Sequence, residues 1–304
     1  MGEQRTILVT GASGLLGRRL LPLLLDDDWA VRGVTRRPAR AGLATGVLPV
    51  EWDGTRVPAA ALAGCEAVVH LAGEPIFGPP SAARRQRIFA SRIDSTRALV
   101  EAFARLSPGE RPRCLLCASA VGYYGSRGEE LLDESASPGA GFLADLCVAW
   151  EAGARAAADL GVRSASLRFG AVLAHEGGAL APLARVFGLG LGGRLGDGLQ
   201  WFPWIQADDA VALIRRALGD ASYAGPVNAV APNPVRNVDF ARALARVLRR
   251  PALVPVPAFA LRALLGELSG ELLGSRRVVP RRALASGFAF EHETIDSALA
   301  AELR

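Results

Sequence analysis

The sequence predicts an α/β fold with a doubly wound parallel sheet and a smaller C-terminal α/β substrate lobe. Short apolar runs that suit strands buried on both faces alternate with helix-like stretches over the first 170 residues. The first run, Ile7–Val9, leads through three glycines into an apolar helical stretch at Leu15–Leu25. Beyond Gly170 the alternation becomes irregular, which indicates a second lobe.

The glycines between the first strand and the first helix are spaced G-x-x-G-x-x-G, at 11, 14 and 17. Gly11 allows the tight turn out of the strand, Gly14 lets the backbone approach a pyrophosphate, and Gly17 lets helix and strand pack closely. The free N–H groups at the helix start then point at the anion, and the helix dipole favours its charge. A surface turn is the alternative, but the position between a buried strand and a helix predicts a Rossmann-type dinucleotide site.

Two arginines follow the second predicted strand, Ala30–Thr35. In a nucleotide-binding fold this strand end faces the adenosine ribose, where an acid holds the 2′-hydroxyl of NAD and arginine accommodates the 2′-phosphate of NADP. Because Arg36 and Arg37 stand there without an acid, we expect the cofactor to be NADP(H). A solvated charged loop is the alternative interpretation.

The remaining strands and helices continue the alternation. We expect strands at 47–52, 67–71, 113–119 and 163–169, and helical stretches at 81–106 and 141–160. A strand and a helix near 205–230 return to the sheet, so residues 1–170 with that return form the dinucleotide-binding domain and 171–304 the substrate lobe. A glycine-rich stretch from Phe187 to Gly198 leads into Trp201–Asp209 and is typical of a loop at the edge of a pocket.

Composition limits the classes of function. The net charge is +5, but the 35 basic residues, all arginine, are spread along the chain without a basic tail, which argues against nucleic-acid binding. No apolar run is long enough to span a bilayer, and the first strand leaves no room for a leader, so we expect a soluble cytoplasmic protein. The four cysteines have no framework spacing and are expected to be inert buried thiols, with no metal site.

Several longer motifs carry a narrower resemblance. They are Ala118–Gly125, Ala149–Glu151, Leu167–Leu173, Gly177–Leu180, Gly190–Gly193, Trp204–Asp209 and Gly225–Pro232. With the glycine spacing, they resemble an atypical group of extended short-chain dehydrogenase/reductases, of the NAD(P)-dependent epimerase/dehydratase-like family, that carry a C-terminal domain of unknown function. The resemblance runs from Ile7 to about Leu299, and it departs at Gln206, where the group usually has histidine.

The resemblance implies which residues hold the cofactor. Leu71-Ala72-Gly73 is similar to the superfamily's Asn-Ala-Gly loop, whose backbone lines the cofactor, and Asp53 corresponds to the acid that reaches the adenine edge. With the glycine turn, the arginine pair and the end of the sixth strand, the predicted cofactor-binding residues are Gly11, Ser13, Gly14, Leu15, Leu16, Gly17, Arg36, Arg37, Asp53, Leu71, Ala72, Gly73, Phe169, Gly170 and Val172.

The superfamily's catalytic dyad is missing. Its chemistry uses a serine or threonine and a Tyr-x-x-x-Lys pair, in which the lysine lowers the pKa of the tyrosine. Ser119 matches the serine, but the positions of the pair, counted back from Glu151, hold Leu143 and Cys147. Leucine has no proton to exchange, and cysteine cannot carry the positive charge. Since the chain contains no lysine, no shift of the alignment restores the dyad.

Few side chains remain to replace the dyad. Tyr123 and Tyr124 follow Ser119 in a glycine-flanked loop at the carboxyl end of a strand, where ligands lie in such sheets. We take Ser119 and Tyr123 as the candidate catalytic residues, with a place in the pocket wall as the alternative role. His70 is expected in the core, and the acids Asp208-Asp209 are expected to cap a helix.

Two functions remain open. The first is an NADP(H)-dependent epimerase or oxidoreductase that acts on an unknown small molecule with an unusual proton donor. The second is a non-catalytic NADP(H)-binding regulatory or scaffold protein. The missing dyad favours the second function, whereas the glycine- and tryptophan-rich loop at the pocket edge favours a small-molecule ligand and so the first. Glu151 is expected to pair with an arginine or to cap a helix rather than to act in catalysis. We expect a monomer or homodimer without a membrane or nucleic-acid partner.

Overall fold

The central sheet has seven parallel strands. The computed structural model describes residues 4–76, 78 and 81–303. The sheet order is β3-β2-β1-β4-β5-β7-β12, so the chain starts inside the sheet, winds to one edge and then to the other. The strands are β1 Thr6–Thr10, β2 Ala30–Thr35, β3 Leu48–Glu51, β4 Cys65–His70, β5 Cys114–Ala120, β7 Arg163–Phe169 and β12 Gly225–Ala229. The predicted doubly wound parallel sheet is confirmed, and its direction switches between β1 and β4.

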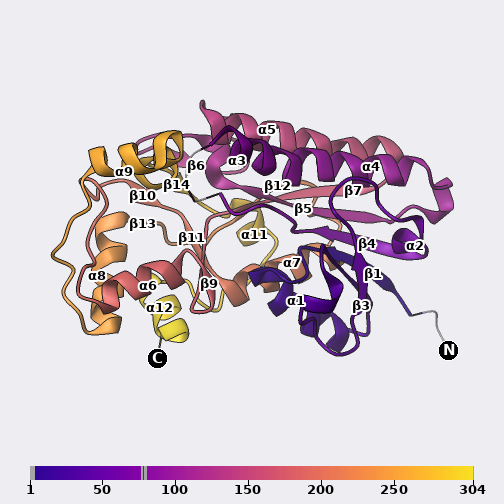
Figure 1. Cartoon of the computed structure of the whole chain (residues 1–304), viewed down its shortest axis with the longest axis horizontal. Coiled ribbons are helices and arrows are strands. Elements are labelled where there is room, and N and C mark those ends of the chain that lie inside the picture. The colour runs from indigo at the N-terminus through magenta and orange to yellow at the C-terminus, as the bar shows by residue number, and fades with distance from the viewer. Residues whose placement is uncertain (1–3, 77, 79–80, 304) are drawn as a thin grey trace.

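Helices cover both faces of the sheet (Figure 1). α1 (Leu15–Asp26) and α7 (Ala207–Gly219) pack on one face. α4 (Ser95–Ala104) and α5 (Phe142–Arg155) pack on the other, around the fully buried ring of Phe103. Each face therefore has its own apolar core, as expected for strands buried on both sides.

The helix predicted at 81–106 is not continuously α-helical. α3 (Ala82–Phe89) passes through a π-helical turn at Ala90–Asp94 into α4. A π turn is wider than an α-helical turn, so the side chains that follow it change face. Arg92, within this turn, is buried, as is Ile88 four residues earlier, although most of its basic neighbours on α3 are exposed.

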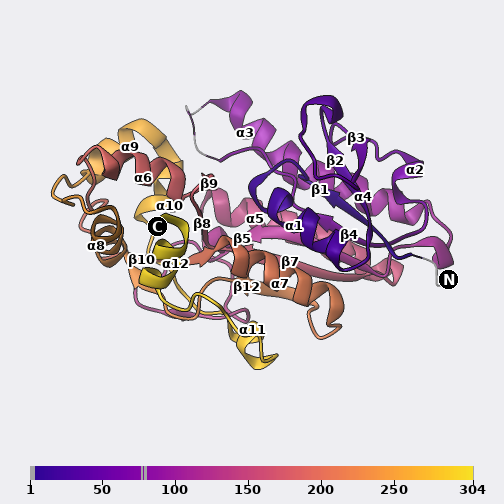
Figure 2. The ribbon, with the colours of Figure 1, turned by 90° about the horizontal axis from the view of Figure 1, so that it is seen from below.

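The elements after β7, apart from α7, β12 and α11, form a lobe at one end of the sheet (Figure 2). The elements after β7 not yet given are β8 Ala171–Ala174, β9 Gly177–Gly178, α6 Leu180–Gly188, β10 Trp201–Phe202, β11 Trp204–Gln206, β13 Val235–Arg236, α8 Asn237–Leu248, α9 Ala258–Leu265, α10 Ser269–Leu273, β14 Arg277–Val278, α11 Arg281–Ala285 and α12 Ile295–Leu303. α6, α8 and α12 enclose a separate apolar core around Phe187, Phe240 and Leu299. Within the described residues, no helix has the length and apolar character needed to cross a membrane.

Two long-range contacts fasten the C-terminal segment to the part of the chain that forms the central sheet. β14 pairs in parallel with β6 (Leu131–Leu132), which follows β5 in the chain. Arg19 on α1 donates hydrogen bonds to Glu176, to Asp208 and to Glu302 of α12, at 2.6, 2.8 and 3.0 Å. Because the Glu302 side chain is only 3% exposed, the end of the chain delivers a nearly buried carboxylate to the first helix.

The start of α7 differs from the prediction that Asp208 and Asp209 cap it. Gln206 is the cap, and its side-chain oxygen accepts hydrogen bonds from the backbone N–H groups of both aspartates. The Asp209 carboxylate instead accepts from the N–H groups of Glu291 and His292, at 2.7 and 3.0 Å. Both acids lie within the first turn, where they still favour the positive end of the helix dipole.

Candidate cofactor and substrate site

The glycine turn after β1 has no room for side chains at two positions. Gly11 has a φ of 68°, and a Cβ there would lie 2.7 Å from the carbonyl carbon of Leu71. A Cβ on Gly17 would collide with the carbonyl oxygens of Gly11 and Ala12. Gly11 therefore makes the turn, and Gly17 brings α1 close to it.

The start of α1 is open to solvent. Gly14 is the N-cap residue, is exposed, and donates its N–H to the Gly11 carbonyl at 2.8 Å. In the described part of the chain no side chain caps this helix, so its first N–H groups are available to an anion. Ser13, Leu15 and Leu16 flank the helix start and are partly exposed. A cradle of this kind fits the pyrophosphate of a dinucleotide.

A buried chain of hydrogen bonds fixes the loop after β4. The Thr10 hydroxyl accepts from the Ala72 N–H at 3.2 Å and bonds to His70 Nδ1 at 2.6 Å. His70 Nε2 lies 3.0 Å from the Ser95 hydroxyl. Because burial lowers the pKa of His70 to about 3, the imidazole is neutral. The Ser95 hydroxyl donates to the Ser91 carbonyl at 2.7 Å, so it accepts from His70, which carries its proton on Nε2. His70 is a core histidine, as expected, and it positions the loop that follows it.

Arg36 and Arg37 follow β2 at the carboxyl edge of the sheet. The Arg36 side chain is 77% exposed, and its guanidinium lies 3.9 Å from Glu74, which makes a weak surface pair. Arg37 is exposed as well. Asp53, predicted at the adenine edge, accepts hydrogen bonds from the Thr55 hydroxyl and N–H, which lower the pKa of this exposed carboxyl. Both arginines can therefore turn toward a phosphate without breaking a buried contact.

The end of β7 belongs to the same edge. Phe169 is its last residue and is buried. A Cβ on Gly170 would lie 2.8 Å from the carbonyl oxygen of Pro203, so only glycine lets the two segments pass this closely. Val172, in β8, packs against the core beneath α1. The structure thus places the predicted cofactor residues after the carboxyl ends of β1, β2, β3, β4 and β7.

An inner cavity of about 200 Å³ adjoins the loop after β4. Its walls come from Leu71–Gly73, from Ser119 near the end of β5 and from α5. Leu143 and Cys147, at the positions of the missing dyad, both line it. Burial raises the pKa of Cys147 to about 12, and nearby carboxylates add to the effect, so the thiol does not ionise near neutral pH. The α5 wall of the cavity therefore offers no group that exchanges protons.

Ser119 belongs to a buried polar network. Its hydroxyl donates to Glu151 Oε1 at 2.7 Å. Arg168 donates to the same carboxylate through two hydrogen bonds of 2.8 Å, and the two side chains are only 3% and 4% exposed. Arg168 also donates to the Tyr124 hydroxyl, which donates to Asn228 at 2.6 Å. Glu151 thus pairs with an arginine, as expected, and Ser119 keeps only its lone pairs for a ligand.

The two tyrosines of the turn at Val121–Tyr124 have different surroundings. Tyr124 is fully buried, and burial raises its pKa to about 12. The Tyr123 ring lies against Arg168, whose Cζ is 3.5 Å from the ring centroid, and stands edge-on to Tyr124. Tyr123 lies outside the lining of the inner cavity. The structure therefore brings Ser119 to the cavity, whereas the predicted partner Tyr123 points to Arg168.

Two charged side chains that the sequence motifs did not single out line the same cavity. Arg92 lies behind the loop, with its Cζ 3.2 Å from the position of a Cβ on Gly73, and donates to the Glu74 carbonyl at 2.9 Å. Glu271 of α10 enters from the C-terminal lobe. The sequence could not single out Arg92, because it lies in an arginine-rich helix, or Glu271, because it lies in an amphipathic segment. In both places the neighbouring residues look like those around exposed surface charges.

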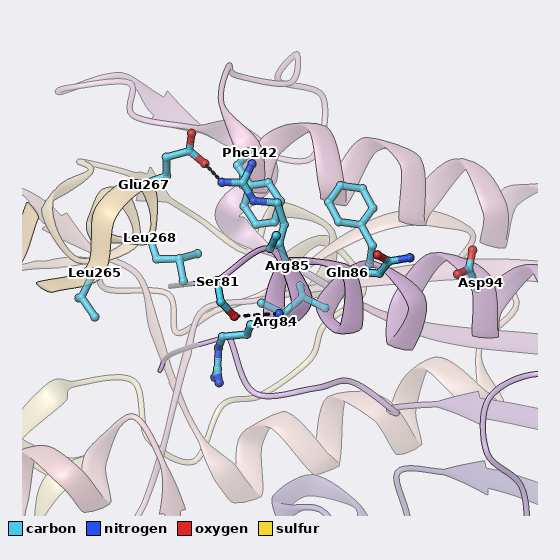
Figure 3. Close-up of a pocket in the computed structure, with 12 residues that line it drawn as sticks. Ser81, Arg84, Arg85, Gln86, Asp94, Phe142, Leu265, Glu267 and Leu268 are labelled. Atoms are coloured by element: carbon cyan, nitrogen blue, oxygen red, sulfur yellow. Dashed lines mark hydrogen bonds and ion pairs between the residues drawn. The ribbon is translucent and has the colours of Figure 1, made fainter. Parts of the chain in front are cut away.

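A larger pocket of about 750 Å³ opens between α3, the start of α5 and the α9–α10 segment (Figure 3). Arg85 crosses it, pairs with Glu267 at 2.8 Å, and lies over the ring of Phe142 at 5.1 Å. Phe142 directly precedes Leu143 of the inner cavity, so α5 contributes side chains to both spaces.

One cluster of side chains has the geometry of metal ligands. His175, Glu176 and Glu302 bring their ligand atoms within 4.8 Å of one another. Arg19 already donates to all four oxygens of the two carboxylates. We therefore assign no metal to this cluster.

Two family models match the chain. A domain of unknown function matches residues 256–302, and the NAD dependent epimerase/dehydratase family matches residues 7–229. The chain belongs to the NAD dependent epimerase/dehydratase family. It is 40% identical over 311 residues to an epimerase family protein SDR39U1 homolog, chloroplastic, of Arabidopsis thaliana, covering 98% of this chain and 87% of that protein. It is 33% identical over 299 residues to the human epimerase family protein SDR39U1, covering 96% and 98%.

Solved structures agree with the family. The crystal structure of human epimerase family protein SDR39U1 (isoform 2) with NADPH has a TM-score of 0.88 and 30% identity, covering 98% of this chain and 99% of that one. A nucleoside-diphosphate sugar epimerase from Corynebacterium glutamicum has a TM-score of 0.80 and 34% identity, covering 99% of this chain and 59% of that one. The predicted resemblance to extended short-chain dehydrogenase/reductases with a C-terminal domain of unknown function is confirmed.

Proposed function

We propose that this chain binds NADP(H) and catalyses an epimerase- or oxidoreductase-type hydride transfer on a small molecule. The observation that carries the proposal is the placement of the glycine cradle, the arginine pair and the inner cavity along one edge of the sheet. Ligands in such sheets bind beyond the carboxyl ends of the strands. The NADPH in the structure of the human relative supports the choice of cofactor.

The residues present fit this cofactor. Side chains at Gly11 and Gly17 would collide with backbone, and the uncapped start of α1 presents N–H groups to a diphosphate. NADP(H), when bound, would supply the hydride exchange. Arg36 and Arg37 would hold the 2′-phosphate in charge-assisted hydrogen bonds. Arg92, buried in the cavity wall, would provide a fixed positive charge in a chain that has no lysine.

Fluorescence titration with NADPH and NADH tests the cofactor assignment. We expect NADPH to bind more tightly, and the double variant Arg36→Ala/Arg37→Ala to lose the preference. A hydrogen bond to a charged group contributes about 1.5–3 kcal/mol, which corresponds to a roughly 10- to 150-fold change in Kd. Arg97→Ala, which removes a 64% exposed side chain on α4, is the matched control. Equal affinities in the wild type, or an unchanged ratio in the double variant, would contradict the assignment.

A regulatory NADP(H)-binding protein without chemistry is the second candidate. Leu143 and Cys147 in the cavity wall favour it, because neither transfers a proton near neutral pH. Tight NADPH binding without turnover on a broad panel of carbonyl compounds and nucleotide sugars would select this candidate over the enzyme.

A further inference from the structure

The inner cavity holds a carboxylate that no part of the superfamily's serine–tyrosine–lysine pattern accounts for. Glu271 of α10 lines it together with Ser119, Leu143 and Cys147. We propose that Glu271, supplied by the C-terminal domain, is the proton-transfer residue of this protein and acts in the place left by the missing tyrosine. The inference rests on the proposed function and names its acid–base group.

Gly122 shows how close the carboxylate lies to the positions of the missing dyad. A Cβ on Gly122 would lie 3.0 Å from Glu271 Oε1, 3.4 Å from Leu143 Cβ and 3.8 Å from Cys147 Sγ. The carboxylate oxygen and both dyad positions therefore surround a single point in the turn that follows Ser119. Because residue 122 has no side chain, this point is free for a close approach by Glu271.

Arg276 holds the carboxylate in this orientation. Its Nη2 donates to Glu271 Oε1 at 3.0 Å, and its Nε donates to the Gly125 carbonyl at 2.8 Å. Arg276 is 5% exposed, and β14, which begins at the next residue, pairs with β6. The arginine thus joins α10 to the turn that carries Gly122. A carboxylate fixed in this way can receive a proton without first being ordered.

The other groups near the cavity are unsuited to the task. Ser119 donates its proton to Glu151, and Tyr123 lies against Arg168. Burial raises the pKa of Cys147 to about 12. Among the described residues that line the cavity, Glu271 is the only carboxylate. Its side chain is 18% exposed, so a proton taken from a ligand can pass on to water.

The proton transfer completes a balanced reaction. In the direction of oxidation, the O–H bond of a substrate alcohol breaks and the proton passes to a carboxylate oxygen of Glu271. The electron pair of that bond forms the second C–O bond of a carbonyl, while the carbon loses its hydride to oxidised nicotinamide. In the direction of reduction, Glu271 returns the proton to the same oxygen. Leu268, three residues before Glu271, lines the outer pocket.

Kinetics, cofactor binding and melting of Glu271 variants test the inference. NADPH oxidation is followed with 2,3-butanedione and 9,10-phenanthrenequinone, and NADP⁺ reduction with UDP-glucose. We expect Glu271→Gln to lower kcat by about 10²- to 10⁴-fold, as the loss of a general base does. NADPH affinity, measured by nicotinamide fluorescence, and melting temperature should stay close to those of the wild type. Formate, which supplies a carboxylate, should restore part of the activity of Glu271→Ala.

Glu271→Asp keeps a charge for Arg276 but retracts the oxygen, so turnover should fall while stability is retained. Asp296→Asn is the matched control, because Asp296 pairs with Arg246 in the same domain at 2.7 Å and lies outside both cavities. If the Glu271–Arg276 pair had only a structural role, turnover would fall in proportion to melting temperature in all variants, and formate would restore no activity. That result, or full turnover in Glu271→Gln, would overturn the assignment.

The remaining outcomes separate this inference from the proposed function. Loss of turnover in Tyr123→Phe together with full turnover in Glu271→Gln would return the proton transfer to Tyr123. A wild-type chain that binds no NADPH would contradict the proposed function itself. A wild-type chain that binds NADPH but turns over none of the probes would contradict both the hydride chemistry and the role of Glu271.

Discussion

Removing either partner of the Glu151–Arg168 pair should destabilise the fold strongly. The two side chains are 4% and 3% exposed and are joined by two hydrogen bonds of 2.8 Å. Glu151→Gln keeps the shape of the side chain but leaves the buried guanidinium without its counter-charge. A buried charge that loses its partner costs about 3–5 kcal/mol, and we expect a loss of this size. Arg168→Met should cost a similar amount, because the Glu151 carboxylate keeps only the Ser119 hydroxyl.

A double variant separates the contribution of the pair from the cost of an isolated charge. Glu151→Met with Arg168→Met replaces both charged side chains by apolar ones of similar length. We expect it to cost less than the sum of the two single variants, because no buried charge remains. Tyr124 loses one donor in this variant but keeps its hydrogen bond to Asn228.

Urea denaturation followed by tryptophan fluorescence measures these changes. The expected loss corresponds to a fall in melting temperature of roughly 5–8 °C for a chain of this size. Asp239→Asn, which breaks a pair of exposed side chains on α8, is the control and should change stability by less than about 0.5 kcal/mol. A loss below about 1 kcal/mol in Glu151→Gln, or strict additivity in the double variant, would refute the reasoning.

Two further predictions concern the cofactor cradle and acid stability. Gly14→Val should abolish NADPH binding in calorimetry but leave the melting temperature nearly unchanged. The valine side chain would fill the exposed space before α1, and its Cβ would lie 3.1 Å from the Gly11 carbonyl oxygen. Retained binding would mean that the loop is only a turn. The hydrogen bond from Arg19 lowers the pKa of Glu176 to about 2 from the 4.5 of an unperturbed glutamate, so its stabilisation is present above the higher value and is lost as the pH falls toward the lower one. Below about pH 5 the unfolding free energy of Glu176→Gln should therefore fall by about 1 kcal/mol less than that of the wild type. This figure is discounted for the 38% exposure of the Glu176 side chain. Equal falls in the two proteins would contradict the prediction.

The strands of the central sheet could be predicted closely from the sequence. The strands expected at Ala30–Thr35 and at 163–169 are observed with those bounds. Each contains a short buried segment, Gly33-Val34 in β2 and Ala165–Phe169 in β7, and such a segment between a helix and a turn is a local property of the sequence. Ser119 reaches the cavity for a related reason, because the carboxyl ends of parallel strands gather at one edge whatever the loops do.

The residues that were not predicted depend on contacts between distant segments or on details of the backbone. Arg92 lies four residues after the buried Ile88, and it is buried because the loop after β4 and the ring of Trp150 cover that side of the helix. Glu271 reaches the cavity because Arg276 and the β14–β6 pairing hold the tail against the turn after β5. Gln206 replaces the aspartates as the helix cap because its longer side chain can curl back to their N–H groups. None of these arrangements leaves a periodic pattern in the sequence.

The cluster around Arg19 affects the order in which the parts of the protein fold during synthesis. Arg19 emerges in the first helix, whereas its partner Glu302 lies 283 residues later. A nascent chain that has emerged as far as α11 can form the complete central sheet and the glycine cradle. Its first helix still lacks the nearly buried carboxylate that α12 delivers. Domains fold largely as units during synthesis, and contacts between distant segments close last. The ion pairs of Arg19 are therefore complete only after α12, and with it the segment that carries Glu271, has been synthesised.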